Sequence, residues 1–154
     1  MVKIERSFPA PASLESEAKK VSGSYEQPDV VSRLRKDFHD KCYICELKNL
    51  QDPQVEHLLP HKNGKYPERK FDWNNLFWSC SHCNGIKNQK KYDDGIIDCC
   101  KNDPELMMTF KLKDGKTEIS AKDEHNSMAV RTALLIYESF NLLNTGMRLS
   151  LIHI

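Results

Sequence analysis

Two cysteine pairs of identical spacing constrain the fold of this chain more than any other feature. They are Cys42-x-x-Cys45 and Cys80-x-x-Cys83, and 34 residues separate the two pairs. Two such pairs are the usual ligand set of a closed, tetrahedral zinc site. Because four thiolates leave no open position on the metal, we expect this zinc ion to be structural. Four buried cysteines without a metal are the weaker interpretation of the repeated spacing.

The composition indicates that a structural metal would contribute strongly to folding. Only 39% of the 154 residues are hydrophobic, with a mean hydropathy of −0.64, so one domain has a small core. No apolar run approaches the roughly 18 residues that span a bilayer, and the N-terminus lacks a secretion signal. We therefore expect a cytoplasmic protein that does not enter a membrane, where thiols stay reduced and favour metal over disulfides. We expect the adjacent Cys99 and Cys100 to be buried or without a specific role, rather than metal ligands.

The elements around the cysteine pairs predict an α+β fold. A strand is expected at residues 54–59, where Pro60 stops it, and a second strand at residues 75–79. The polar residues 61–72 between them predict a loop, and residues 84–91 a short basic helix.

Helices and a hairpin are expected on either side of this unit. The Asp114-Gly115 pair is a strong signal for a tight turn between two strands. We expect a hairpin over residues 107–120 and three helices, at residues 13–20, 29–39 and 127–143. Ser13 is the expected cap of the first helix, and Asn126 or Ser127 that of the last. We divide the chain into an N-terminal helical lead (1–41), a core (42–91) and a hairpin–helix extension (92–154). We also expect a C-terminal portion to be missing after Ile154.

The segments between and beside the cysteines resemble the HNH endonuclease family. They are residues 55–60 (Val-Glu-His-Leu-Leu-Pro), residues 72–80 (Asp-Trp-Asn-Asn-Leu-Phe-Trp-Ser-Cys) and Cys83-Asn84-x-x-Lys87, so the resemblance covers roughly residues 42–91. It implies a ββα-metal core, treble-clef-like and stapled by the four-cysteine zinc site. Within the family, the chain most resembles HNH proteins of Septu and retron-associated anti-phage systems, and its Cys-x-x-Cys-Asn ending also resembles the recombination endonuclease VII group.

The resemblance implies a catalytic role for several matching residues. His57 matches the general base that activates water, a task suited to a neutral imidazole. Glu56 and Asn84 match the ligands of a catalytic Mg²⁺ or Mn²⁺, although aspartate or histidine is commoner at the first position and histidine at the second. Asn75 matches the asparagine that braces the loop between the strands. The implied activity is metal-dependent hydrolysis of DNA phosphodiesters, leaving 5′-phosphate and 3′-hydroxyl ends.

Positive charge gathers in the same part of the chain. Residues 31–91 carry 12 Lys and Arg against 7 Asp and Glu, whereas residues 92–154 carry 7 against 10. We expect Lys87, Lys90 and Lys91 to contact the phosphates of a nucleic acid, with Lys87 the strongest candidate. A solvated helix face is the alternative.

The anti-phage resemblance also implies an ATPase partner in a two-component defence system. Two other interpretations stay open: a non-catalytic zinc-binding module that recognises nucleic acid or protein, and a nuclease subunit that is inert until its partner binds. The module explains the cysteines but not the grouping of Glu56, His57 and Asn84. Of the other histidines, His61 is expected in the loop, and His82 is a less favoured zinc ligand.

Overall fold

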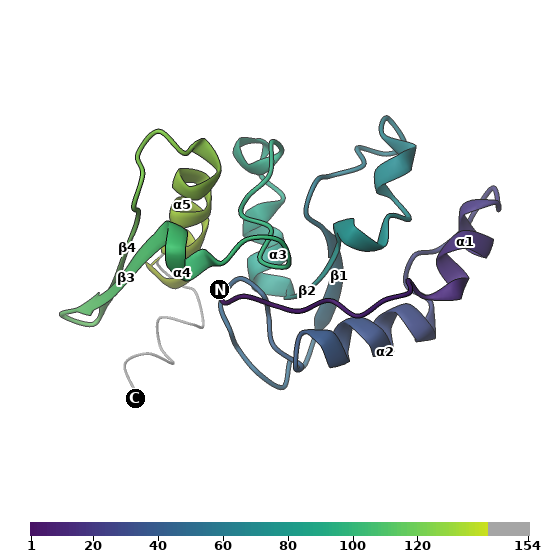
Figure 1. Ribbon diagram of the computed structural model, residues 1–154, viewed down its shortest axis with the longest axis horizontal. Coiled ribbons are helices and arrows are strands. Elements are labelled where there is room, and N and C mark those ends of the chain that lie inside the picture. Colours follow the sequence, from purple (N-terminus) through teal and green to yellow (C-terminus); the bar gives the residue numbers. More distant parts are fainter. Residues whose placement is uncertain (142–154) are drawn as a thin grey trace.

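A strand, a long loop, a second strand and a helix form the centre of the molecule (Figure 1). β1 (Pro53–His57) pairs antiparallel with β2 (Leu76–Cys80), and α3 (Ser81–Lys87) begins where β2 ends. The computed structural model describes residues 1–141 and has the α+β order expected around the cysteine pairs. β2 is buried along its whole length, because both α3 and α2 (Pro28–Asp37) pack against it.

β1 begins one residue earlier than predicted and ends two residues earlier, because the chain leaves the sheet after His57. The backbone N–H of Leu58 donates to the Asn75 carbonyl at 2.9 Å, and the N–H of Leu59 donates to Asn75 Oδ1 at 2.8 Å. These bonds turn the chain into the loop that separates the strands. Two 3₁₀ turns lie within this loop: η1 (Pro67–Arg69) and η2 (Trp73–Asn75).

The helix predicted for residues 84–91 is wrong at both ends. α3 begins earlier, at Ser81, because the Cys80 sulfur caps it by accepting a hydrogen bond from the Cys83 N–H at 3.4 Å. The helix ends at Lys87. After a short break, a separate 3₁₀ turn follows, η3 (Lys90–Tyr92).

α1 (Ala12–Ala18) and α2 lie at one end of the molecule, close to their predicted positions (Figure 1). Ser13 does not cap α1 as expected. Its hydroxyl instead bonds to Asp29 Oδ1 at 2.5 Å and so joins the two helices. Pro28 opens α2, where its fixed φ suits a first helical turn.

The first eight residues form an extended strap that runs across the molecule to α1 (Figure 1). Near its start, the Ile4 N–H donates to the carbonyl of the buried Cys99 at 2.9 Å. Further along, Arg6 donates to the carbonyls of Trp73 and Leu76, both at 2.8 Å. The strap therefore ties the C-terminal extension to the loop and strand of the central unit.

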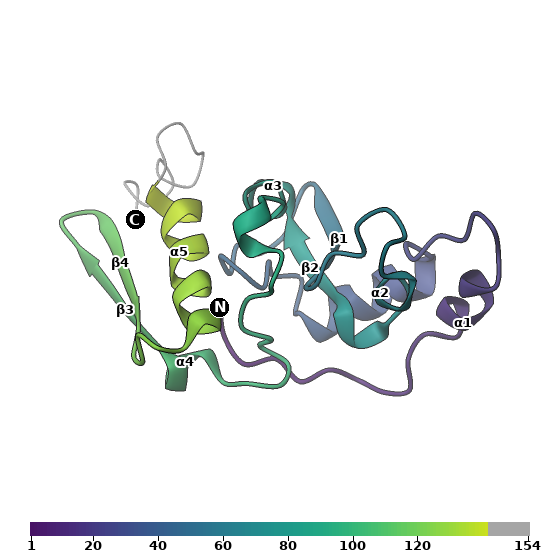
Figure 2. The same cartoon turned by 90° about the horizontal axis from the view of Figure 1, so that it is seen from above.

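A hairpin and a long helix form the other end of the described chain. Asp114 and Gly115 have φ values of 50° and 71°, as a two-residue type I′ turn requires. Asn126 caps the long helix, since its Oδ1 accepts from the Ala129 N–H at 3.1 Å. The elements are α4 (Pro104–Met107), β3 (Met108–Lys113), β4 (Lys116–Ala121) and α5 (Ser127–Asn141). α5 packs between the hairpin and α3 (Figure 2), and its predicted end at residue 143 lies outside the described residues.

Aromatic side chains fill the centre of the core. The ring centre of Phe77 lies 4.8 Å from that of Tyr43 and 5.6 Å from that of Phe38. Trp73 and Trp78 are buried, as expected for packing residues. This packing holds Tyr43, which reaches the candidate site, in a defined position. Among the described helices, none combines the length and apolarity needed to cross a membrane.

Candidate functional site

The four cysteines of the two pairs meet at one point. Their sulfur atoms all lie within 4.8 Å of one another, and those of Cys45 and Cys80 are 3.9 Å apart. A tetrahedral site with Zn–S bonds of about 2.3 Å has S···S edges of about 3.8 Å. All four side chains are buried, which closes the cluster to solvent. The donor set therefore fits a structural zinc ion, in agreement with the prediction from the spacing.

Backbone hydrogen bonds position the first cysteine pair. The Cys42 N–H donates to the Leu47 carbonyl and the Glu46 N–H donates back to the Cys42 carbonyl, both at 2.9 Å. Between the cysteines, the Tyr43 N–H donates to the Trp78 carbonyl of β2 at 3.0 Å. The first pair is thus fixed to the strand that carries the second pair.

A cavity of about 330 Å³ is lined by residues of β1, α3 and the loop after β1. Glu56, His57 and Asn84, three of the predicted site residues, line it together with Lys87. The first two end β1, and the other two are three residues apart on α3 and so share one face of that helix. The cavity wall also includes Tyr25, His61, Lys62, Asn88, Tyr92 and Asp93.

A hydrogen bond to the backbone defines the tautomer of the His57 ring. Its Nε2 lies 3.0 Å from the Lys70 carbonyl oxygen, which can only accept a hydrogen bond, so Nε2 carries the hydrogen. In the neutral ring, Nδ1 then holds the free lone pair. Burial lowers the pKa of His57 to about 4, so the ring is neutral at pH 7. The rings of Tyr25 and His61 pack edge-on against it, with centroids at 4.6 and 4.8 Å.

Glu56 is buried and already engaged at both carboxylate oxygens. The Tyr43 hydroxyl donates to Oε1, and the Lys87 Nζ lies 3.1 Å from Oε2. Burial raises the pKa of Glu56, and the charge of Lys87 and the bond from Tyr43 counteract that rise. The exposed fractions of the Lys87 and Glu56 side chains are only 4% and 3%. Lys87 therefore lies inside the protein against a carboxylate, so the alternative of a solvated helix face is wrong for this residue, and the predicted phosphate contact stays a prediction.

The oxygen donors of the cavity are of the kind that Mg²⁺ and Mn²⁺ prefer. Mg²⁺ usually binds through one or two carboxylates, several waters and substrate phosphate. Glu56 supplies one carboxylate, and the side chain of Asn84, which also lines the cavity, supplies an amide oxygen. The chemistry of this donor set fits a hard cation, but the positive charge beside Glu56 is supplied by the Lys87 ammonium.

Asn75 braces the loop, as its matching position implies. Its Oδ1 accepts from the Leu59 N–H at 2.8 Å, while its Nδ2 donates to the carbonyls of Leu59 and Arg69 at 2.9 and 3.0 Å. The side chain does not line the cavity. The bond from Asn75 to Arg69 holds the backbone next to Lys70, the residue whose carbonyl contacts the His57 ring.

The other predicted residues lie outside the cavity. Lys90 is exposed, and Lys91 forms an ion pair with Glu138 of α5. His82 is not among the clustered ligands, because its Nε2 bonds to the Ser139 carbonyl at 3.0 Å.

Three residues beside the cavity were not singled out from the sequence. Tyr43 lies between the cysteines of the first pair, so its closeness to the cluster was the available signal. Tyr25 comes from the segment between α1 and α2, where no motif marks it. Asp93 pairs with Lys62 across the cavity wall at 2.8 Å, a contact that only the tertiary fold creates.

Comparison with protein-family models, curated proteins and solved structures gave no match to this chain.

Proposed function

We propose that this protein is an HNH-type endonuclease that hydrolyses phosphodiester bonds of DNA on a zinc-stapled ββα-metal core. One observation carries the proposal: Glu56, His57 and Asn84 line a single cavity on the strand–strand–helix unit that holds the four clustered cysteines. The proposal also rests on the motif resemblance over residues 42–91.

The side chains of the cavity are suited to activating water. The Nδ1 lone pair of His57 accepts a proton from a water molecule as its oxygen attacks the phosphorus, and the bond from Nε2 to Lys70 keeps the ring in this tautomer. Glu56 and Asn84 would hold Mg²⁺ or Mn²⁺, which when bound supplies positive charge to the phosphate and to the departing 3′ oxygen. The Lys87 ammonium adds a further positive charge to the cavity wall.

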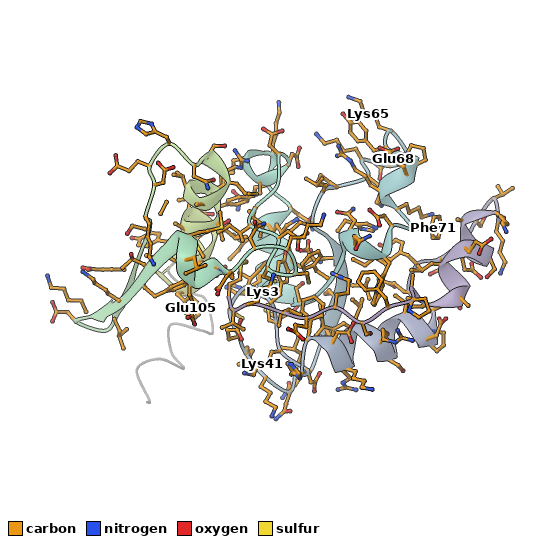
Figure 3. All side chains as sticks on the ribbon, in the orientation of Figure 1. Lys3, Lys41, Lys65, Glu68, Phe71 and Glu105 are labelled. Atoms are coloured by element: carbon orange, nitrogen blue, oxygen red, sulfur yellow. The ribbon has the colours of Figure 1, made fainter. Side chains whose placement is uncertain are left out.

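Basic side chains around the cavity support contact with a polyanion. The segment of residues 31–91 carries the excess of Lys and Arg over Asp and Glu. Lys65 is exposed on the loop between the strands and extends away from the rest of the molecule (Figure 3). Lys90 is exposed beyond α3. We propose that these two lysines contact phosphates outside the cleaved bond.

A plasmid-nicking assay tests the proposed activity. The zinc-loaded wild type should cut DNA with Mg²⁺ or Mn²⁺, and His57→Ala should lose about 10²- to 10⁴-fold in rate, as expected for removal of a general base. His125→Ala is the matched control, because this histidine is exposed and does not line the cavity. A folded, zinc-loaded wild type that cuts no DNA, or a His57→Ala variant as fast as the wild type, would contradict the proposal.

A non-catalytic zinc-binding module is the second candidate function, because Glu56 is fully engaged by Tyr43 and Lys87. A binding module should retain DNA without cutting it, and His57→Ala should leave its affinity unchanged. The anti-phage role, the ATPase partner and the cytoplasmic location are proposals that rest on the resemblance and the composition. A nuclease that is inert alone should begin to cut when such an ATPase is added.

A further inference from the structure

The Lys87 ammonium lies beside the carboxylate that the proposed metal ion would need. The ammonium lies 3.1 Å from Oε2 of Glu56 and donates to the His57 carbonyl at 2.8 Å. Both side chains are almost fully buried, so solvent screens their attraction poorly. Glu56 is therefore paired with a cation that belongs to the chain itself.

Binding two cations at the Glu56 carboxylate costs electrostatic free energy. A divalent ion bound to Oε2 would lie within a few ångströms of the Lys87 ammonium, where like charges repel strongly inside a protein. Oε1 is held separately by the Tyr43 hydroxyl, so the carboxylate keeps its orientation when the ammonium leaves. Lys87 and Glu56 both line the cavity, which gives the displaced ammonium a solvent-accessible region to enter.

We propose that Lys87 is an internal counterion that holds Glu56 until a divalent cation displaces it, so that metal binding releases the ammonium into the cavity. This inference rests on the proposed function, because it assumes that Glu56 is a ligand of the catalytic metal. It assigns Lys87 a role in setting the metal affinity of the site.

Direct titration of Mn²⁺ into the zinc-loaded full chain, followed by electron paramagnetic resonance, tests the competition without measuring activity. Lys87→Met keeps the length of the side chain and removes its charge, so Mn²⁺ should bind about tenfold tighter or more. Lys36→Met is the matched control, since it makes the same charge change at an exposed lysine that does not line the cavity, and it should alter the Kd by less than about twofold. Glu56→Gln combined with Lys87→Met should abolish the tighter site.

Chemical labelling of wild-type lysines gives a second measurement that does not depend on the folding of a variant. Mg²⁺ should raise the reactivity of Lys87 toward an amine-directed reagent, as measured by mass spectrometry, and leave that of the exposed Lys36 unchanged. Equal Mn²⁺ affinity in Lys87→Met and wild type, with Lys87 unreactive in saturating Mg²⁺, overturns the competition even where the wild type cuts DNA. If Mn²⁺ binds to neither protein, the metal centre of the proposed function fails as well.

Discussion

Replacing Asn75 tests whether one buried amide holds the loop that orients His57. Asn75 is 6% exposed and makes three hydrogen bonds at 2.8–3.0 Å, two to Leu59 and one to Arg69. Each such bond contributes about 0.5–1.5 kcal/mol, and Asn75→Ala leaves its backbone partners without the side chain. We therefore expect the free energy of unfolding to fall by about 2–4 kcal/mol.

Urea denaturation of the zinc-loaded protein measures this loss. Asn74→Ala is the matched control, because the neighbouring asparagine is exposed and should change the free energy of unfolding by less than about 0.5 kcal/mol. Asn75→Asp keeps an acceptor for the Leu59 N–H but loses both donors, so it should destabilise at least as much as alanine. The reasoning is refuted if Asn75→Ala loses less than about 1 kcal/mol. Because Arg69 precedes Lys70, whose carbonyl fixes the His57 ring, the nicking rate should also fall further than the unfolded fraction accounts for.

Three further predictions concern the stability of the fold. Cys83→Ser should lower both the zinc content and the far-UV circular dichroism signal of the folded chain, since binding of structural zinc in small domains contributes about 10–16 kcal/mol to folding. A zinc-free protein with an unchanged spectrum would contradict this prediction. Tyr43→Phe removes a hydrogen bond to the Glu56 carboxylate and should cost about 1.5–3 kcal/mol in urea denaturation, so an unchanged midpoint would argue against that bond. Gly23→Ala places a Cβ 1.9 Å from the Glu17 carbonyl oxygen and should lower the melting temperature, whereas Gly85→Ala meets open space and should lower it little or raise it.

The parts of the site that were predictable from the sequence are those that local spacing determines. The cysteine cluster follows from two pairs with two intervening residues, and Asn84 reaches the cavity because it follows Cys83 in the same short helix. Glu56 and His57 are neighbours at the end of one strand, so their closeness was certain from the chain. Only the tertiary fold could show that all three line the same cavity.

The parts that could not be predicted depend on contacts between distant segments. Lys87 belongs to a polar, basic run that predicts a phosphate contact or a solvated helix face, whereas its ammonium is held inside the protein by the buried Glu56 and by the His57 carbonyl. The start of α3 was misplaced because the capping group is a cysteine sulfur, which helix-start rules do not include. The strap of residues 1–8 has no periodic pattern, and its position is decided by partners such as Cys99 and Trp73.

The cysteine cluster and the cavity are linked by Tyr43. Burying the pair of Glu56 and Lys87 costs several kcal/mol per ion before their attraction is counted, a large demand on a chain with a small apolar core. A zinc ion at the cysteines would offset that cost, because it fixes the turn that holds Tyr43 by its N–H to β2 and by its hydroxyl to Glu56. Loss of zinc would then release Tyr43 from Glu56 and expose Lys87 to solvent. For this reason, added Mg²⁺ should not restore cutting to a zinc-free chain, and only reloading the cysteine cluster should do so.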